Sequence, residues 1–225
     1  MSLEERRIDL GRDVQVLDVI TVRLTRPEPE RYQTENHVFD ARCRWTWSGT
    51  VSWDDLQPAV EEPTGPLWIN GESSSHGRND RVAEAAAAVL DRSLYLVRPE
   101  FLRVQVAAEG SGPAAAQRRV RARFRLAGFW YCLSVTDIPV ELDYLSRPDG
   151  VYPIAAALLC VSLGEVFHGH AYKLAAAVIT PERAAAASRA AATASRVASA
   201  RADAPTGIGD KTRRQTAERD PGKVP

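Results

Sequence analysis

Residues 119–126 alternate strictly between arginine and an apolar residue, and this alternation is the feature that most restricts the fold. The apolar positions are Val120, Ala122, Phe124 and Leu126, and the basic positions are Arg119, Arg121, Arg123 and Arg125. A repeat of two places successive side chains on opposite faces of a β-strand, whereas a helix would mix the two classes around its surface. The segment is therefore predicted to be a strand with one face in a hydrophobic core and an arginine face outside.

Further short segments rich in β-branched and aromatic residues surround this strand, and Gly and Pro separate them. Strands are predicted at residues 14–24, 67–69, 93–97, 102–108, 129–135, 158–163 and 172–179. Between them we expect a helix start at Ser52, a loop over 70–81, a short helix within 81–90, a turn at 127–128 and a loop over 164–170. Many short strands with this punctuation are typical of small barrels or sandwiches. The predicted fold class is mainly β, a β-rich α+β chain with short helices.

The character of the sequence changes after Ile179. Residues 181–225 are dominated by Ala, Ser, Thr and Arg, and we expect a disordered tail with at most a transient helix, because it has no apolar stripe to dock. This tail holds nine of the 29 basic and five of the 29 acidic residues, so it carries +4 and the remainder −4. A net acidic core does not attract nucleic acid by bulk charge. Such binding would need a local patch or the tail.

The sequence indicates a cytoplasmic chain with no membrane partner. No run approaches the roughly 20 apolar residues needed to cross a bilayer, and no apolar stretch follows the charged residues 4–7 as it would in a secretory signal. Cys43, Cys132 and Cys160 are far apart in the sequence. They are therefore predicted to be reduced thiols, and the last two, which lie in apolar runs, to be buried.

The arginine face is the strongest indication of a ligand from residue chemistry alone. Four guanidinium groups on one strand face could follow a phosphate backbone, while Trp130 or Tyr131 on the next strand could stack on bases. A solvated face paired with acids such as Glu109 or Glu141 explains the same pattern. Both interpretations stay open at this point.

Two loops, residues 32–36 and 71–81, are dense in hydrogen-bonding side chains. Such loops either satisfy their own backbone or face a ligand. Acid–base catalysis would require a shared cleft for the acids of the polar segments, Glu35, Asp80, Asp137 and Glu165. The sequence has no nucleophile elbow, phosphate loop or zinc-protease motif, so we expect neither enzymatic activity nor a cofactor. His168 and His170 lack a third ligand at metal spacing, so no metal site is expected.

Several motifs follow the order found in the prokaryotic dual OB-domain family. They are Val16-Leu17-Asp18-Val19, Tyr32-Gln33-Thr34-Glu35-Asn36, Leu67-Trp68-Ile69-Asn70-Gly71, Gly77-Arg78-Asn79-Asp80-Arg81, Val120-Arg121-Ala122-Arg123-Phe124, Leu133-Ser134-Val135-Thr136-Asp137, Ser162-Leu163-Gly164-Glu165 and Tyr172-Lys173-Leu174-Ala175. Over residues 14–179 the chain resembles this family. The resemblance implies two small OB-like barrels, at residues 1–92 and 93–180, and it ends where the disordered tail expected from composition, at 181–225, begins. The family's usual N-terminal segment has no counterpart here, so we expect the first barrel to be incomplete and to expose an edge.

The resemblance also implies a non-enzymatic binding module of a bacterial defence or mobile-element system, with single-stranded nucleic acid as ligand. The alternative is a protein-interaction or scaffold module with a defence-system protein as partner and no nucleic-acid ligand. The residues predicted to bind nucleic acid are Arg119, Arg121, Arg123, Arg125, Trp130 and Lys173. The polar or loop residues predicted to face a ligand are Gln33, Glu35, Asn36, Trp68, Asn79, Asp80, Arg81, Asp137 and Glu165.

Overall fold

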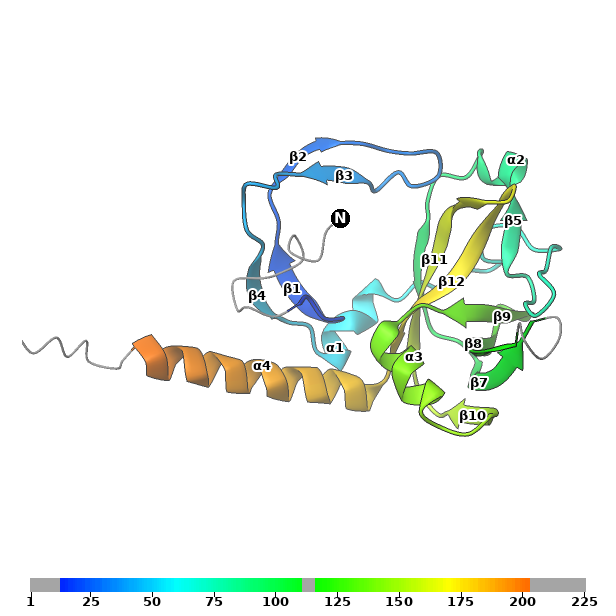
Figure 1. The fold of residues 1–225 in the computed structure, drawn as a ribbon. Helices are drawn as coiled ribbons and strands as arrows, with labels where there is room; N and C mark the ends of the chain where they lie inside the picture. The colour runs from blue at the N-terminus through cyan, green and yellow to red at the C-terminus, as the bar shows by residue number, and fades with distance from the viewer. Residues whose placement is uncertain (1–12, 111–115, 203–225) are drawn as a thin grey trace, which may run out of the picture. The chain divides into compact units, whose positions relative to one another are not determined.

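The structure is a computed structural model that describes residues 13–110 and 116–202 (Figure 1). The chain divides into two compact units, residues 1–191 and 192–225, and of the second unit residues 192–202 are described. Strands dominate the first unit, which confirms the prediction of a mainly β chain. No helix of the described residues is long and apolar enough to cross a membrane.

The first part of the chain forms two separate two-stranded ribbons. Its elements are β1 (Asp18–Thr21), β2 (Leu24–Pro27), β3 (His37–Phe39), β4 (Thr46–Thr50), the helix α1 (Trp53–Leu56) and the 3₁₀ helix η1 (Gln57–Ala59). β1 pairs antiparallel with β4, and β2 pairs antiparallel with β3. The single strand predicted over 14–24 is therefore wrong, because β1 and β2 belong to different ribbons. The predicted helix start is confirmed, with Ser52 capping α1.

The rest of the described chain forms one eight-stranded sheet with three helices. The elements are β5 (Arg81–Ala83), α2 (Glu84–Ala87), β6 (Leu94–Val97), β7 (Phe101–Glu109), β8 (Gln117–Leu126), β9 (Phe129–Val135), α3 (Ile138–Leu145), β10 (Gly150–Ile154), β11 (Leu158–Phe167), β12 (His170–Ile179) and α4 (Pro181–Ala202). The strand order is β10-β7-β8-β9-β12-β11-β6, and β5 pairs with β12.

The strand pairing closes this sheet into a barrel. β6 and β7 are two halves of one bent strand, interrupted at residues 98–100, and β10 and β11 are interrupted in the same way at 155–157. β10 pairs antiparallel with β7, and β11 pairs antiparallel with β6, so the two bent strands run side by side along both halves. β9 and β12 are parallel. A closed five-stranded arrangement with this order is the OB fold.

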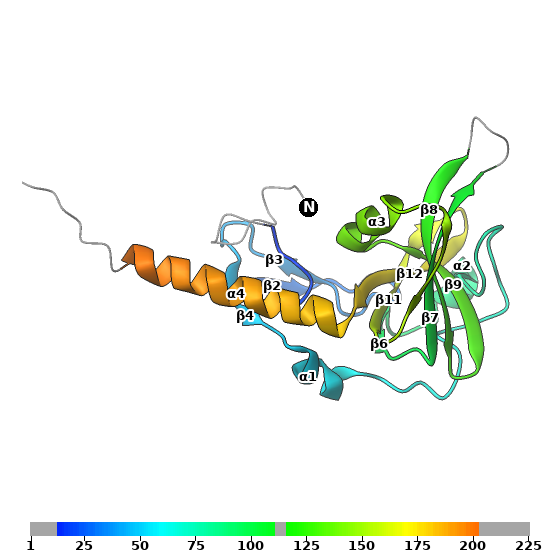
Figure 2. The same cartoon turned by 90° about the horizontal axis from the view of Figure 1, so that it is seen from below.

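This barrel spans residues 94–179, within the predicted second domain. α3 packs against β7, β8 and β9 at the barrel (Figure 2). β5 also joins the sheet, although it precedes the boundary predicted at residues 92 and 93. That boundary stays a prediction.

The alternation that predicted the central strand is confirmed by burial. Val120, Ala122, Phe124 and Leu126 are all buried, while the arginines between them lie on the outer face. The ring of Phe124 stacks on that of Tyr131 from β9 at 5.0 Å. These side chains form the barrel core, because each points inward from a strand of the meander β7-β8-β9. The cysteines are free thiols, with Cys132 buried and Cys160 partly buried.

Three predicted elements differ from the structure. Residues 67–69 do not form a strand: Leu67 and Trp68 are buried, Ile69 is exposed, and Trp68 has a positive φ of 56°. The loop predicted over 164–170 is instead a strand hairpin, in which β11 and β12 continue almost to a tight turn at His168-Gly169. The helix predicted within 81–90 shrinks to α2, because residues 81–83 pair with β12.

Residues 181–202, predicted to belong to a disordered tail, form the helix α4. Its first turns dock because Ala184 is buried against Leu158 and Ile179. The guanidinium of Arg183 also bonds the buried carboxylate of Asp137. A small alanine can therefore anchor a helix where no large apolar residue is present. The remainder of the predicted tail, residues 203–225, lies outside the described residues.

Candidate functional site

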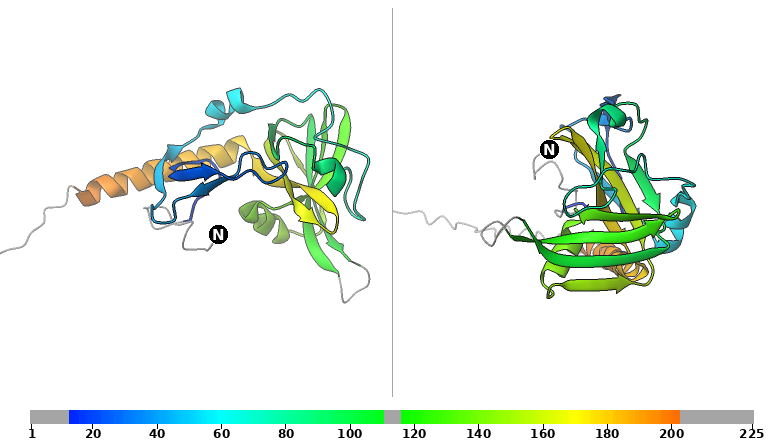
Figure 3. Two further views of the ribbon diagram at one scale, coloured as in Figure 1. Left: turned by 90° about the horizontal axis from the view of Figure 1, so that it is seen from above. Right: turned by 90° about the vertical axis from the view of Figure 1, so that its right-hand side faces the viewer.

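The outer face of β7, β8 and β9 carries side chains in rows that cross the three strands, which lie in front in the right-hand view of Figure 3. The register defines the rows as Phe101–Arg125–Trp130, Arg103–Arg123–Cys132 and Gln105–Arg121–Ser134. The predicted arginine face is therefore wider than β8. Arg103 was missed because no arginine repeat surrounds it in the sequence, and only the register places it beside Arg123.

A groove of about 410 Å³ crosses this face. Its lining residues are His76, Gly77, Arg78, Gln105, Arg123, Trp130, Tyr131 and Cys132. The side chains of Arg78 and Arg123 are exposed, and within the described part of the chain neither forms an ion pair with an acid. Arg123 donates one hydrogen bond to the side-chain oxygen of Gln105 at 3.2 Å. The groove is therefore locally positive, although the core as a whole is net acidic.

Aromatic rings flank the groove at the end where β8 and β9 meet. The Trp130 side chain is 39% exposed, and its ring lies edge-to-face with that of Phe101 at 5.5 Å. The guanidinium of Arg103 lies 4.6 Å from the centre of the Phe101 ring. Partly exposed aromatic rings beside arginines are the combination on which unpaired bases stack.

Arg121 forms a largely buried ion pair on this face. Its Nε and one terminal nitrogen donate to the two carboxylate oxygens of Glu109, at 2.5 and 2.8 Å. Burial alone would raise the pKa of Glu109, but the hydrogen bonds and charge of Arg121 outweigh it and hold that pKa below its ordinary value. The ion-paired interpretation of the face therefore applies to Arg121.

The other arginines of β8 differ in how their charge is compensated. Arg125 pairs with Glu100 at 3.2 Å, with both side chains about half exposed. Arg119 is exposed and donates to the side-chain oxygen of Gln117 at 2.7 Å. Arg123 is therefore the member of the predicted set that both lines the groove and lacks an acidic partner among the described residues.

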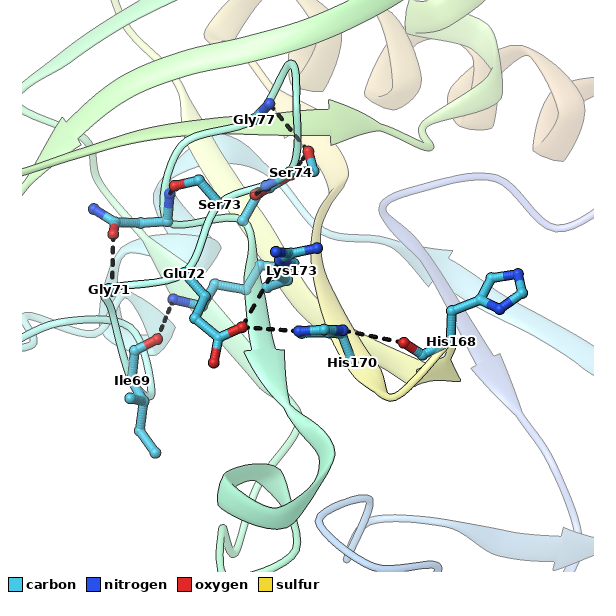
Figure 4. A network of polar contacts seen from close by, with 12 residues as sticks. Ile69, Gly71, Glu72, Ser73, Ser74, Gly77, His168, His170 and Lys173 are labelled. Carbon is cyan, nitrogen blue, oxygen red and sulfur yellow. Dashed lines mark hydrogen bonds and ion pairs between the residues drawn. The ribbon is translucent and has the colours of Figure 1, made fainter.

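The polar loop at residues 71–81 folds back on itself at the edge of the groove (Figure 4). The carboxylate of Asp80, which is 3% exposed, accepts hydrogen bonds from the backbone N–H and the hydroxyl of Ser74 at 2.7 and 2.5 Å. Asn79 accepts from the N–H of Gly71 and donates to the carbonyl of Trp130. Both residues were predicted to face a ligand; instead the Asp80 side chain satisfies the loop, and the Asn79 side chain joins the loop to β9.

This loop also fills a gap in the barrel. β9 and β12 pair directly only through Leu174–Ser134 and Ala175–Val135. Where they diverge, Arg78 makes two backbone hydrogen bonds with Cys132, and the carbonyl of Asp80 accepts from the N–H of Lys173. A segment from the first half of the chain thereby completes the hydrogen bonding of both strands.

Lys173 was predicted to contact nucleic acid, but the structure places it in the interior. It is 1% exposed, and its Nζ donates to the carbonyl of Ile69 and the side-chain oxygen of Asn70, both at 2.8 Å. Burial lowers the pKa of Lys173 to about 7. Trp68 is likewise buried and donates its indole N–H to the carbonyl of Arg92. Neither side chain is available to an external ligand in this structure.

The loop at residues 32–36 docks onto the barrel through its own polar groups. The hydroxyl of Ser93 donates to the carboxylate of Glu35, and the amide of Asn36 donates to the side-chain oxygen of Gln33 at 3.1 Å. Gln33 and Glu165 line a second, separate groove of about 210 Å³. The structure thus brings these two predicted residues together, away from the arginine groove.

Three of the four acids considered for catalysis have separate partners, and the fourth, Glu165, lines the second groove. Glu35 bonds Ser93, Asp80 bonds Ser74, Asp137 bonds Arg183, and no hydrogen bond within the described ranges joins two of the four. Arg81 lies in β5 with its Nε 3.8 Å from Glu72, a carboxylate that also bonds His170 at 2.8 Å. No group of three or more His, Cys, Asp or Glu residues within the described ranges could hold a metal ion.

A family model described as a dual OB-containing domain matches residues 1–178. No curated protein and no solved structure matches the chain significantly. The match covers the barrel almost to the end of β12 as well as the ribbons and loops that precede it.

Proposed function

The chain belongs to the dual OB-containing domain family, and from this premise we propose that it is a non-catalytic module that binds single-stranded nucleic acid along the groove on β7, β8 and β9. OB folds bind oligonucleotides and oligosaccharides through the face of their second and third strands. β8 and β9 are the second and third strands of this barrel. The groove therefore lies where the fold binds its ligands.

Charge favours nucleic acid over an uncharged oligosaccharide. Arg78, Arg103 and Arg123 lie on this face, and in the part of the chain that the structure describes none of them forms an ion pair with an acid. Arginine is suited to phosphate because its planar group donates several hydrogen bonds and cannot lose its charge. A local patch of this kind provides what a net acidic core requires for binding a polyanion.

The aromatic residues favour a single strand over a duplex. Trp130 is 39% exposed and lies beside Arg125 on the arginine face. Side chains can stack on a base only when the base is unpaired and free of its own neighbours. The observation that carries the proposal is the row Arg103–Arg123, with Arg78 at its edge and Trp130 next to it.

Fluorescence anisotropy of the full chain with labelled single-stranded DNA and RNA tests this function. We expect affinity to fall as salt rises, and Arg123→Ala or Arg103→Ala each to lower the slope of log affinity against log salt by about one. Trp130→Ala should cost about 1–3 kcal/mol of binding with little change in slope. Arg26→Ala, an exposed arginine of β2 outside the barrel, is the matched control. Salt-independent binding, or no binding, would contradict the proposal.

A second candidate function is a protein-interaction module. Ile138 and Leu142 lie one turn apart on α3, and each is 63% exposed. Exposed apolar residues on one helix face are typical of protein contacts. A purified product of a neighbouring gene that binds the wild type stoichiometrically, but not Ile138→Ser/Leu142→Ser, would support this function.

The setting in the cytoplasm and in a bacterial defence system belongs to the proposal, and neighbouring genes for nucleases or NTPases would support it.

A further inference from the structure

We propose that Asp80 and Arg121 are positioning residues that hold Arg78 in the groove. This inference rests on the proposed function and concerns the same site. Neither residue needs to touch the ligand. Both act on the turn that directly precedes Arg78 in the chain.

The carboxylate of Asp80 fixes this turn. One oxygen accepts from the N–H of Ser74 at 2.7 Å and the other from the Ser74 hydroxyl at 2.5 Å. The Ser74 oxygen in turn accepts from the N–H of Gly77 at 3.1 Å (Figure 4). The buried Asp80 carboxylate thus fixes the conformation of the turn that leads into Arg78.

The backbone of Arg78 is fixed on both sides. Its N–H and carbonyl bond Cys132 of β9 at 3.2 and 3.0 Å, and two residues later the carbonyl of Asp80 bonds the N–H of Lys173 in β12 at 2.8 Å. Gly77 leaves no room for adjustment, since a Cβ there would lie 1.8 Å from the Asp80 carboxylate. The exposed side chain of Arg78 is therefore attached to a backbone with little freedom. Less entropy is then lost when Arg78 binds a ligand.

Arg121 compensates the charge of Asp80. Its Nε and one terminal nitrogen bond Glu109, while the other terminal nitrogen lies 3.9 Å from the Asp80 carboxylate. A negative charge on a carboxylate that is 3% exposed is costly to bury without hydrogen bonds and a nearby positive charge. Loss of Arg121 should therefore loosen the turn and, through it, the placement of Arg78.

Coupling distinguishes a positioning role from a direct contact. If Asp80 acts through Arg78, then removing both should cost no more than removing Arg78 alone. If Asp80 or Arg121 contributed independently, the effects would add. Arg123 enters the groove from β8 with no bond to the turn, so its effect should add to that of Asp80→Asn.

The experiment is a double-mutant cycle read by anisotropy with a labelled oligo-dT, using the full chain at several salt concentrations. Arg78→Ala, Asp80→Asn and Arg121→Gln should each weaken binding about fivefold and lower the salt slope by about one. Asp80→Asn in the Arg78→Ala background should change neither quantity, whereas in the Arg123→Ala background it should again cost about fivefold. Thermal unfolding verifies that each variant is folded, and Ser74→Ala replaces Asp80→Asn in the cycle if the latter does not fold.

Two outcomes would overturn the inference, and they are distinguishable. If Arg78→Ala and Arg123→Ala both leave affinity unchanged, the proposed function is wrong and the positioning role falls with it. If both weaken binding but Asp80→Asn adds fully to Arg78→Ala, or leaves the salt slope unchanged, the groove binds nucleic acid and only the positioning role is wrong.

Discussion

Arg121 and Glu109 form a two-point ion pair between neighbouring strands, with side chains only 12% and 13% exposed. The two hydrogen bonds, at 2.5 and 2.8 Å, join β8 to the end of β7. An arginine so engaged has its strongest donors occupied and is costly to separate from its partner. Arg121 therefore contributes to stability and acts on the groove only through the turn before Arg78, whereas Arg123, two residues further along the same strand face, lines the groove itself.

Arg121→Ala should lower the free energy of unfolding by about 3 kcal/mol, because it leaves the Glu109 carboxylate partly buried without its partner. Urea denaturation measures the change. Arg119→Ala, on the same strand face but exposed, is the control and should change stability by no more than about 0.5 kcal/mol. If both substitutions lowered the free energy of unfolding equally, the ion pair with Glu109 would not be a source of stability.

Gly77→Ala should destabilise the chain by about 1–3 kcal/mol, the usual range for forcing an atom into a packed site. A Cβ at this position would lie 1.8 Å from a carboxylate oxygen of Asp80, and the turn that Asp80 bonds would have to open. Gly65→Ala is the matched control, since a Cβ there meets no atom within 4 Å. Thermal unfolding of both variants is the measurement, and a Gly77 variant as stable as the Gly65 variant would contradict the packing argument.

The strand of residues 119–126 was predictable because its side chains report their own environment. Period-two alternation predicts which face is buried, and the structure confirms the burial of Val120, Ala122, Phe124 and Leu126. The site around it was only partly predictable. Arg103 and Arg123 become neighbours through strand register, and register depends on contacts between residues distant in sequence. Arg78 reaches the groove through backbone bonds to Cys132, which no local pattern reveals.

The burial of Lys173 did have a signal in the sequence. On a strand, residues 171, 173 and 175 share one face, and Ala171 and Ala175 leave room there for a long side chain. All three are buried. Docking of α4 had no comparable signal, because Ala184 looks like every other alanine of its segment. Its burial depends on Leu158 and Ile179, which only the fold brings to it.

Stability should rise with pH above neutrality because of Lys173. Its pKa is lowered to about 7 in the folded chain from an ordinary value of 10.5, so between these values the unfolded chain binds more protons. Raising the pH therefore favours the folded state, by at most about 1.4 kcal/mol per pH unit. Below pH 7 both states are protonated and this dependence vanishes.

Urea denaturation of wild type and Lys173→Met measures this slope. Both proteins are compared between about pH 7.0 and 8.5, the interval just above the lowered pKa of Lys173. The interval is limited because burial raises the pKa of Cys132 and Cys160, which acts in the opposite direction near their ordinary value of 9.0. The variant should lose the rise. A wild-type slope equal to that of the variant would show that Lys173 is not the titrating group.

Arg183 should anchor the start of α4 through Asp137, whose side chain is fully buried. The guanidinium bonds both carboxylate oxygens and the carbonyl of Val178, and the carboxylate also accepts from the N–H of Val178 at 2.9 Å. Arg183→Ala leaves that charge unpaired, so we expect a loss of about 3–5 kcal/mol and faster hydrogen exchange over residues 181–188. Arg196→Ala, which alters an exposed arginine further along the same helix, should leave exchange at 181–188 unchanged.

Arg183→Ala/Asp137→Asn should recover part of the stability, because it removes the buried charge together with its partner. Unchanged exchange in Arg183→Ala would mean that the apolar contacts of Ala184 hold the helix without the ion pair.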